Sequence, residues 1–110
     1  MRAVTVKQPG GLDNLSLDTV EVADPDAGEV QVRWHATSLN FHDYMVAAGL
    51  ISVPDGRIPM SDGAGEVTAV GEGVLDWRVG DKVMSTFFPL WREGAPRMQN
   101  LPAVAGEPVD

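Results

Sequence analysis

The sequence predicts a mainly β domain with one short helix, and three observations support this class. Short runs in which apolar and polar residues alternate recur along most of the chain, as strands with one buried face require. A single segment switches to helical spacing. Glycine- and proline-rich turn sequences, such as residues 9–11 and 24–28, separate these runs. The length of 110 residues fits one small domain with a single core.

Five segments have the composition and alternation of strands. The clearest reads EVQVRWHAT: its apolar residues from Val30 to Ala36 would share one face, while His35 would lie on the opposite, solvent-exposed face. The others read RAVTVK, LSLDTVEV, GEVTAV and DKVMSTFF, at residues 2–7, 15–22, 65–70 and 81–88. The sequence from Pro89 onward shows no periodicity and predicts a loop.

Helical spacing is confined to the segment NFHDYMVAAGL, at residues 40–50. Its residues at i, i+3, i+4 and i+7 are Phe41, Tyr44, Met45 and Ala48. We therefore expect a helix from Phe41 to Ala48 whose apolar face, Tyr44 included, packs on the core. Asn40 is a favourable N-cap, and Gly49 is a favourable residue to end the helix.

The composition excludes several classes of partner. The chain carries 16 acidic and 8 basic residues, a net charge of −8, which disfavours binding to nucleic acid and to anionic membrane surfaces. It has no cysteine, so disulfides are excluded and a metal site would depend on His, Asp and Glu. No signal peptide is visible, nor an apolar run of the about 20 residues that a membrane span needs, so a cytoplasmic location is expected.

Two glycine pairs, Gly63/Gly65 and Gly71/Gly73, raise the question of a phosphate-binding loop. A dinucleotide fingerprint would need a third glycine where Thr68 stands, followed by a helix. The following residues, EVTAV, instead have the composition of a strand, and no Lys-Ser/Thr pair follows a glycine as in a P-loop. We therefore expect these glycines to serve turns and the close approach of strands.

The segment GAGEVTAVGEGVLDWRVGDKV, residues 63–83, resembles the pattern G-A-G-x-V-x-x-V-G-x-x-V-x-x-x-x-x-G-D-x-V of medium-chain dehydrogenases/reductases. SLNFHDYMVAAGL, residues 38–50, looks like the segment that opens the catalytic cleft in the same superfamily. The resemblance implies a GroES-like, partly open β-barrel over residues 1–110. It also implies that this catalytic, or substrate, domain is incomplete here and that its parent enzyme carries a separate Rossmann cofactor domain.

The positions that bind catalytic zinc in many members are changed in this chain. Asn40 stands where those members have a cysteine, and Ser61, followed by Asp62, stands where they have the histidine of G-H-E-G-A-G. Together with L-N-x-x-D at residues 39–43, this pattern is similar to the zinc-free, quinone-reductase-like branch. That branch implies hydride transfer from NADPH or NADH to a carbonyl, enone or quinone, in a homodimeric parent. The chain alone is expected to be inactive, because half of the cofactor site would lie on the Rossmann domain.

The same resemblance implies two catalytic residues. Asn40 is expected to hydrogen-bond the nicotinamide ribose or the substrate carbonyl, although an N-cap role alone is an alternative. His42 occupies the place of a proton-relay residue and could protonate an enolate, the alternative being an exposed surface histidine.

The residues expected to border substrate or cofactor are Asn40, Phe41, Asp43, Tyr44, Ser61 and Asp62. Structural roles stay open for four of them: helix-start bonds for Asp43, core packing for Tyr44, and loop attachment for Ser61 and Asp62. Two other classes of function also remain open, a GroES-like binding module such as a co-chaperonin and a non-catalytic interaction scaffold.

Overall fold

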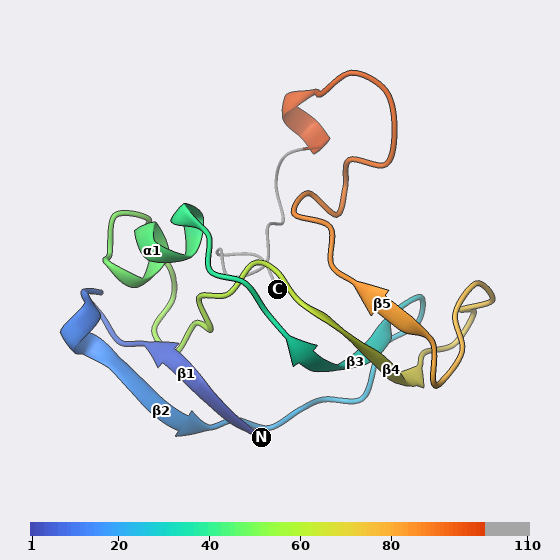
Figure 1. The fold of residues 1–110 in the computed structure, drawn as a ribbon, viewed down its shortest axis with the longest axis horizontal. Coiled ribbons are helices and arrows are strands. Elements are labelled where there is room, and N and C mark those ends of the chain that lie inside the picture. The colour runs from blue at the N-terminus through green and yellow to red at the C-terminus, as the bar shows by residue number, and fades with distance from the viewer. Residues whose placement is uncertain (101–110) are drawn as a thin grey trace.

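The computed structural model describes residues 1–100, which form two separate antiparallel sheets and one α-helix (Figure 1). Strand β1 (Arg2–Val6) pairs with β2 (Leu15–Thr19), and the register joins Val4 to Leu17. Strands β3 (Val30–Ala36), β4 (Ala64–Val70) and β5 (Lys82–Met84) form the second sheet with β4 in the centre. Helix α1 (Phe41–Ala47) lies between β3 and β4 in the chain, and short 3-10 turns occupy η1 (Leu12–Asn14) and η2 (Met98–Asn100).

The expected class, mainly β with one short helix, is confirmed, and the sheets stay open rather than closing into a barrel within residues 1–100. All five strands and the helix lie in the predicted segments, but β2 ends at Thr19 rather than at residue 22. Strand β5 is shorter than predicted and ends at Met84, because the chain leaves the sheet after Ser85 donates a last backbone hydrogen bond to Gly63. The two 3-10 turns were missed, since three residues are too few to show a periodicity.

Glycines allow the close approach of neighbouring segments around β4, as the sequence predicts. A Cβ atom added to Gly65 would lie 2.2 Å from the carbonyl oxygen of Arg33 on β3. One added to Gly71 would lie 1.8 Å from the carbonyl oxygen of Asp26. Both distances are far below van der Waals contact, so only glycine fits. Because β4 is a strand, the glycine pair also lacks the helix that a dinucleotide fingerprint requires.

The hydrophobic core is small and lies where α1 meets β1. Val6, Val46 and Val53 are buried together, with Ile51 packed against them. Backbone hydrogen bonds close this region, since Val6 exchanges bonds with the turn at Gly56 and Arg57. The core therefore fixes α1 to the first sheet.

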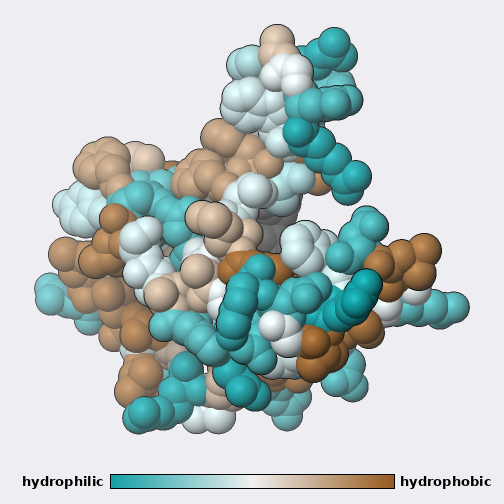
Figure 2. Space-filling view, turned by 45° about the vertical axis from the view of Figure 1, so that its right-hand side comes forward, coloured by the Kyte–Doolittle hydropathy of each residue, from teal (hydrophilic) through white to brown (hydrophobic). Residues whose placement is uncertain are grey.

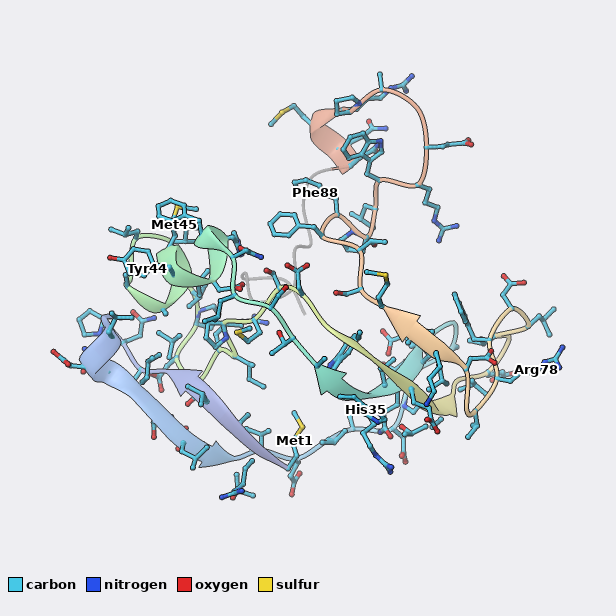
Figure 3. All side chains as sticks on the ribbon, in the orientation of Figure 1. Met1, His35, Tyr44, Met45, Arg78 and Phe88 are labelled. Atoms are coloured by element: carbon cyan, nitrogen blue, oxygen red, sulfur yellow. The ribbon has the colours of Figure 1, made fainter. Side chains whose placement is uncertain are left out.

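The prediction of which face of α1 packs on the core is wrong. Phe41 and Tyr44 are 71% and 48% exposed, and their stacked rings have centroids 5.8 Å apart. Tyr44 lies on the outer side of the helix (Figure 3). The buried side carries Asp43, Val46 and Ala47. The physical reason is that Asp43 makes buried polar bonds that fix the rotation of the helix, and an apolar pattern cannot reveal such an anchor.

The segment after β5 rises away from the two sheets and forms a separate projection (Figure 1, Figure 2). A chain of aromatic contacts runs along its base: the ring of His42 meets Phe87 edge to face at 5.2 Å, and Phe88 lies 4.8 Å from Phe87. The projection is thus linked to the first turn of α1. No helix in the described part of the chain is long and apolar enough to cross a bilayer. His35 is exposed on β3, as predicted, but Trp34 and Ala36 of the predicted apolar face are exposed too, so the expected alternation of burial is absent in the second half of this strand.

Candidate functional site

Asn40 begins α1 as its N-cap, which confirms the predicted cap. Its Oδ1 accepts hydrogen bonds from the backbone N–H groups of His42 (2.7 Å) and Asp43 (3.3 Å). In return the Oδ2 of Asp43 accepts the backbone N–H of Asn40 at 3.0 Å, which completes a capping box. Local sequence therefore fixes the backbone on which the Asn40 side chain stands.

The other end of the Asn40 amide links the helix to a distant part of the chain. Its Nδ2 donates to Ser61 Oγ at 2.7 Å and to Asp62 Oδ2 at 2.9 Å. An amide NH2 carries two hydrogens, so both donors are engaged. A ligand that is to bind this amide must take the place of one of these two oxygens.

Asp43 is the buried centre of the same network, with an exposure of 2%. Its Oδ1 accepts both the backbone N–H (3.0 Å) and the hydroxyl (2.7 Å) of Ser61, a residue that is also 2% exposed. With the bond from Asn40, the carboxylate receives three hydrogen bonds, which offset the cost of burying it. Four of the predicted residues, Asn40, Asp43, Ser61 and Asp62, thus form one network.

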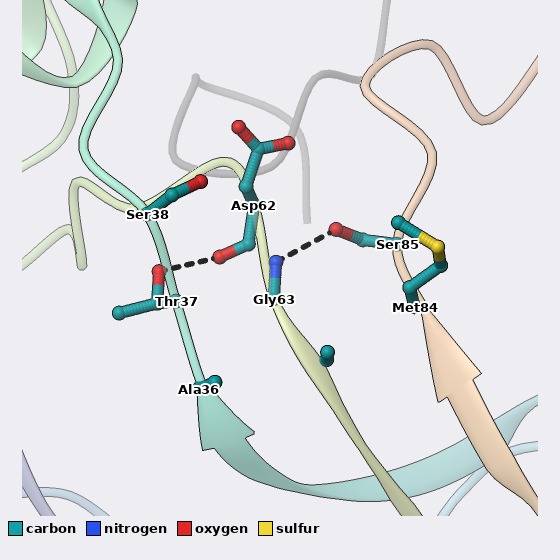
Figure 4. A pocket seen from close by; sticks show the side chains of 8 residues that line it. Ala36, Thr37, Ser38, Asp62, Gly63, Met84 and Ser85 are labelled. Atoms are coloured by element: carbon teal, nitrogen blue, oxygen red, sulfur yellow. Dashed lines mark hydrogen bonds between the residues drawn. The ribbon is translucent and has the colours of Figure 1, made fainter.

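A cleft of about 440 Å³ adjoins this network at the ends of β3, β4 and β5 (Figure 4). The residues lining it are Ala36, Thr37, Ser38, Asp62, Gly63, Ala64, Met84 and Ser85. The hydroxyl of Thr37 donates to the carbonyl of Asp62 (2.6 Å), and Gly63 N–H donates to Ser85 Oγ (2.9 Å). Asp62 both lines the cleft and bonds Asn40, so it connects the two.

The remaining predicted residues lie around this centre in different ways. The side chain of His42 is 11% exposed, so the alternative of an exposed surface histidine is wrong. Its Nδ1 lies 3.8 Å from Asp43 Oδ1, and its ring packs against Phe87. Phe41 and Tyr44 lie on the outer side of α1 and are not among the residues that line the cleft.

Sequence reasoning missed Thr37, Ser38, Met84 and Ser85 as cleft-lining residues. Two signals were available. Thr37 and Ser38 are small polar residues between a strand and the Asn40 cap, and Ser85 directly follows a predicted strand run. Their shared location depends on which strands are neighbours, and strand order is not visible in the sequence.

The pKa values that depart from the ordinary values of their groups belong to ion pairs on the strands, outside the cleft. A hydrogen bond from Lys7, assisted by Thr5 and Ser16, lowers the pKa of Asp18 to about 2. A hydrogen bond from Lys82 likewise lowers the pKa of Glu66. These pairs join neighbouring strands or their ends, since Lys7 follows β1 and Lys82 begins β5.

The fold is that of the medium-chain dehydrogenase/reductase superfamily. Residues 26–106 match the alcohol dehydrogenase GroES-like domain, and the chain belongs to that family. A mycocerosic acid synthase-like polyketide synthase of Mycolicibacterium smegmatis is 46% identical over 85 residues, which is 76% of this chain and 4% of that protein.

Solved structures show the same relationship. A quinone oxidoreductase of Escherichia coli complexed with NADPH is 30% identical, with a TM-score of 0.70 over 76% of this chain and 26% of that one. A cobalt- and zinc-bound alcohol dehydrogenase of Pyrobaculum aerophilum is 39% identical, with a TM-score of 0.72 over 76% of this chain and 25% of that one. The chain therefore spans about a quarter of these two structures, both of which are oxidoreductases by name.

Proposed function

We propose that this chain is the substrate-side part of an NAD(P)H-dependent oxidoreductase that transfers a hydride to an enone or quinone without catalytic zinc. One observation carries the proposal. Asn40 and Ser61, at the two positions where zinc-dependent relatives have metal ligands, hydrogen-bond each other at 2.7 Å. The place of a metal is thus taken by an amide and a hydroxyl that hold the two segments together.

The donor set at these positions does not suit zinc. Zinc in proteins is bound by thiolates, imidazoles and carboxylates, and a carboxamide nitrogen carries no lone pair for it. The hydroxyl of Ser61 is already bonded on both sides, to Asn40 and Asp43. Residues 1–100 contain no group of three His, Cys, Asp or Glu residues that could hold a metal ion.

The residues present suit the nicotinamide end of a dinucleotide rather than its pyrophosphate. The cleft has the size of a small-ligand site and carries the hydroxyls of Thr37, Ser38 and Ser85. Gly65 and Gly71, by contrast, lie against the backbone carbonyls of Arg33 and Asp26, so they cannot cradle a phosphate. Because much of dinucleotide affinity lies in the pyrophosphate, we expect the chain by itself to be inactive.

The cofactor would supply the hydride, which adds to the β-carbon of an enone. The protein's part is to stabilise the negative charge that then develops on the substrate oxygen, and Asn40 Nδ2 is the donor placed for it once Asp62 yields its bond. A proton must also reach the α-carbon to complete the reduction. His42, whose backbone N–H is bonded to Asn40 and whose side chain is largely buried, is the proposed donor.

The test is turnover by the full-length parent enzyme, because the chain by itself is expected to be inactive. NADPH and NADH are each supplied with 2-cyclohexenone or 1,4-benzoquinone, and the loss of reduced cofactor is followed. We expect reduction that survives dialysis against a chelator. Activity that disappears with the chelator and returns with zinc would overturn the zinc-free mechanism, and no turnover with any pair would favour a binding module or scaffold instead.

A second candidate substrate class is the α,β-unsaturated acyl thioester. The observations favouring it are the 46% identity to a polyketide synthase and the likeness to a solved enoyl reductase, which is 27% identical with a TM-score of 0.61. The crotonyl thioester of N-acetylcysteamine is a suitable soluble probe. A kcat/KM for this thioester above that for 2-cyclohexenone would support the candidate, and no reduction of it would exclude it.

A further inference from the structure

The hydroxyl of Ser61 lies in the middle of a directional chain of hydrogen bonds. It donates to Asp43 Oδ1 at 2.7 Å and receives a hydrogen from Asn40 Nδ2 at 2.7 Å. The direction follows from the partners, because Asp43 Oδ1 also accepts the backbone N–H of Ser61 and a hydroxyl has one hydrogen to give. The Ser61 hydroxyl must therefore donate its hydrogen to Asp43 and can only accept a hydrogen bond from Asn40.

This direction determines which way the Asn40 amide faces. A flipped amide would place Oδ1 against Ser61 Oγ with no hydrogen between them. It would also place the NH2 group against the backbone N–H groups of His42 and Asp43, which need an acceptor. Both ends of the flipped amide would be mismatched in a partly buried setting, so the network favours one orientation.

We propose that Asp43 is a positioning residue: acting through the hydroxyl of Ser61, it holds the Asn40 amide with its NH2 toward Asp62 and the cleft. Asp43 does this from the interior, since it and Ser61 are each 2% exposed. Asp62 is the partner that a ligand would displace, because it lines the cleft and accepts the second hydrogen of the amide.

The orientation of the Asn40 amide restricts which ligand groups can bind to it. This step rests on the proposed function. The amide offers the cleft side a hydrogen-bond donor and no acceptor, so the group that replaces Asp62 at Asn40 must carry an acceptor oxygen. A carbonyl or quinone oxygen meets this requirement directly. A substrate that must donate to Asn40, such as an alcohol bound through its O–H, would find no acceptor there.

The first experiment measures the orientation itself in the intact protein. The side-chain NH2 signals of Asn40 are identified by nuclear magnetic resonance through their loss in Asn40→Ser, and their hydrogen exchange is followed. Ser61→Ala should speed this exchange about 5-fold, the loss of one hydrogen bond. Ser61→Thr, which restores a hydroxyl, should return it to the wild-type rate.

The second experiment reads turnover with NADPH and 2-cyclohexenone. Ser61→Ala should lower kcat about 10-fold with KM little changed, as the loss of a supporting residue does. Asp43→Asn should lower kcat as well, but should add less than about 2-fold in the Ser61→Ala background, because both act along one chain of bonds. Ser16→Ala is the matched control, since it removes a similar serine–aspartate bond (3.0 Å, to Asp18) on β2.

The outcomes separate this inference from the proposed function. Unchanged Asn40 exchange in Ser61→Ala overturns the positioning role, and so do additive effects of Asp43→Asn and Ser61→Ala on kcat. If the wild-type protein does not reduce the enone, the proposed function fails. The exchange measurement still decides whether Asp43 and Ser61 orient Asn40, because it needs no substrate.

Discussion

Substitution of Asn40 separates its role as a helix cap from its role in the reaction. The cap contributes about 1 kcal/mol to stability. The structure adds the two bonds from Nδ2, to Ser61 and Asp62, each contributing about 1 kcal/mol. Asn40→Ala should therefore lower the free energy of unfolding by roughly 2–3 kcal/mol. Asn40→Ser keeps a capping oxygen and loses only the amide N–H donors. This variant should therefore lower the free energy of unfolding by roughly 1–2 kcal/mol.

The losses in kcat should not follow the order of the losses in stability. If Asn40 polarises the substrate oxygen, both variants lose the donor and both should lose about 10²-fold or more in kcat. The assay is steady-state reduction of 2-cyclohexenone by the intact protein, with urea unfolding of the same samples. Asn14→Ala is the matched control, because Asn14 makes its side-chain bond to Gly10 (2.7 Å) in the first sheet's connection. An Asn40→Ser variant with near-normal turnover, beside an Asn40→Ala variant that merely unfolds earlier, would refute the reasoning and leave His42 as the catalytic candidate.

Three further predictions test the metal, the packing and the electrostatics. Elemental analysis after dialysis should find no stoichiometric zinc; one zinc per chain that is lost in a His42 variant would contradict the donor analysis. Gly65→Ala should destabilise the protein at the upper end of roughly 1–3 kcal/mol, because its Cβ would meet the Arg33 carbonyl at 2.2 Å. Gly56→Ala, at φ +83° with nothing within 4 Å, should cost about 1 kcal/mol, and equal losses in urea unfolding would argue against the strand contact. Because the native pKa of Asp18 is lowered from 3.8 to about 2, its stabilising contribution is complete above pH 3.8 and is lost as the pH falls toward 2. Asp18→Asn should flatten the pH dependence of the unfolding free energy in this window, and an unchanged slope would contradict the assignment to the Lys7 pair.

The sequence predicts the elements of this fold well, because their signals are local. Alternation locates the strands, and the Asn40 cap and Gly49, at φ +79°, mark the two ends of α1. The rotation of α1 could not be predicted in the same way. It depends on buried bonds between Asp43 and Ser61, which are 18 residues apart, and the apolar pattern alone points to the opposite face.

The candidate site shows the same division between local and distant information. Its residues could be singled out one at a time from the changed metal-ligand positions. Their arrangement could not, because Asn40 meets Ser61 and Asp62 across 21 and 22 residues. The cleft depends in addition on β3 and β5 lying on either side of β4, a strand order that no local pattern encodes.

The hydrogen-bond network also narrows the groups that can act on a ligand. Asp43 and Ser61 are buried and bonded to each other, so the geometry favours a supporting role for them over direct contact with substrate. Asp62 reaches the cleft, and Asn40 lies one hydrogen bond behind it. In a zinc-dependent relative, an ion would hold the helix start and the following loop together and also polarise the substrate. Here the first task is carried by the network, and the second depends on whether a substrate oxygen can displace Asp62 from the amide of Asn40.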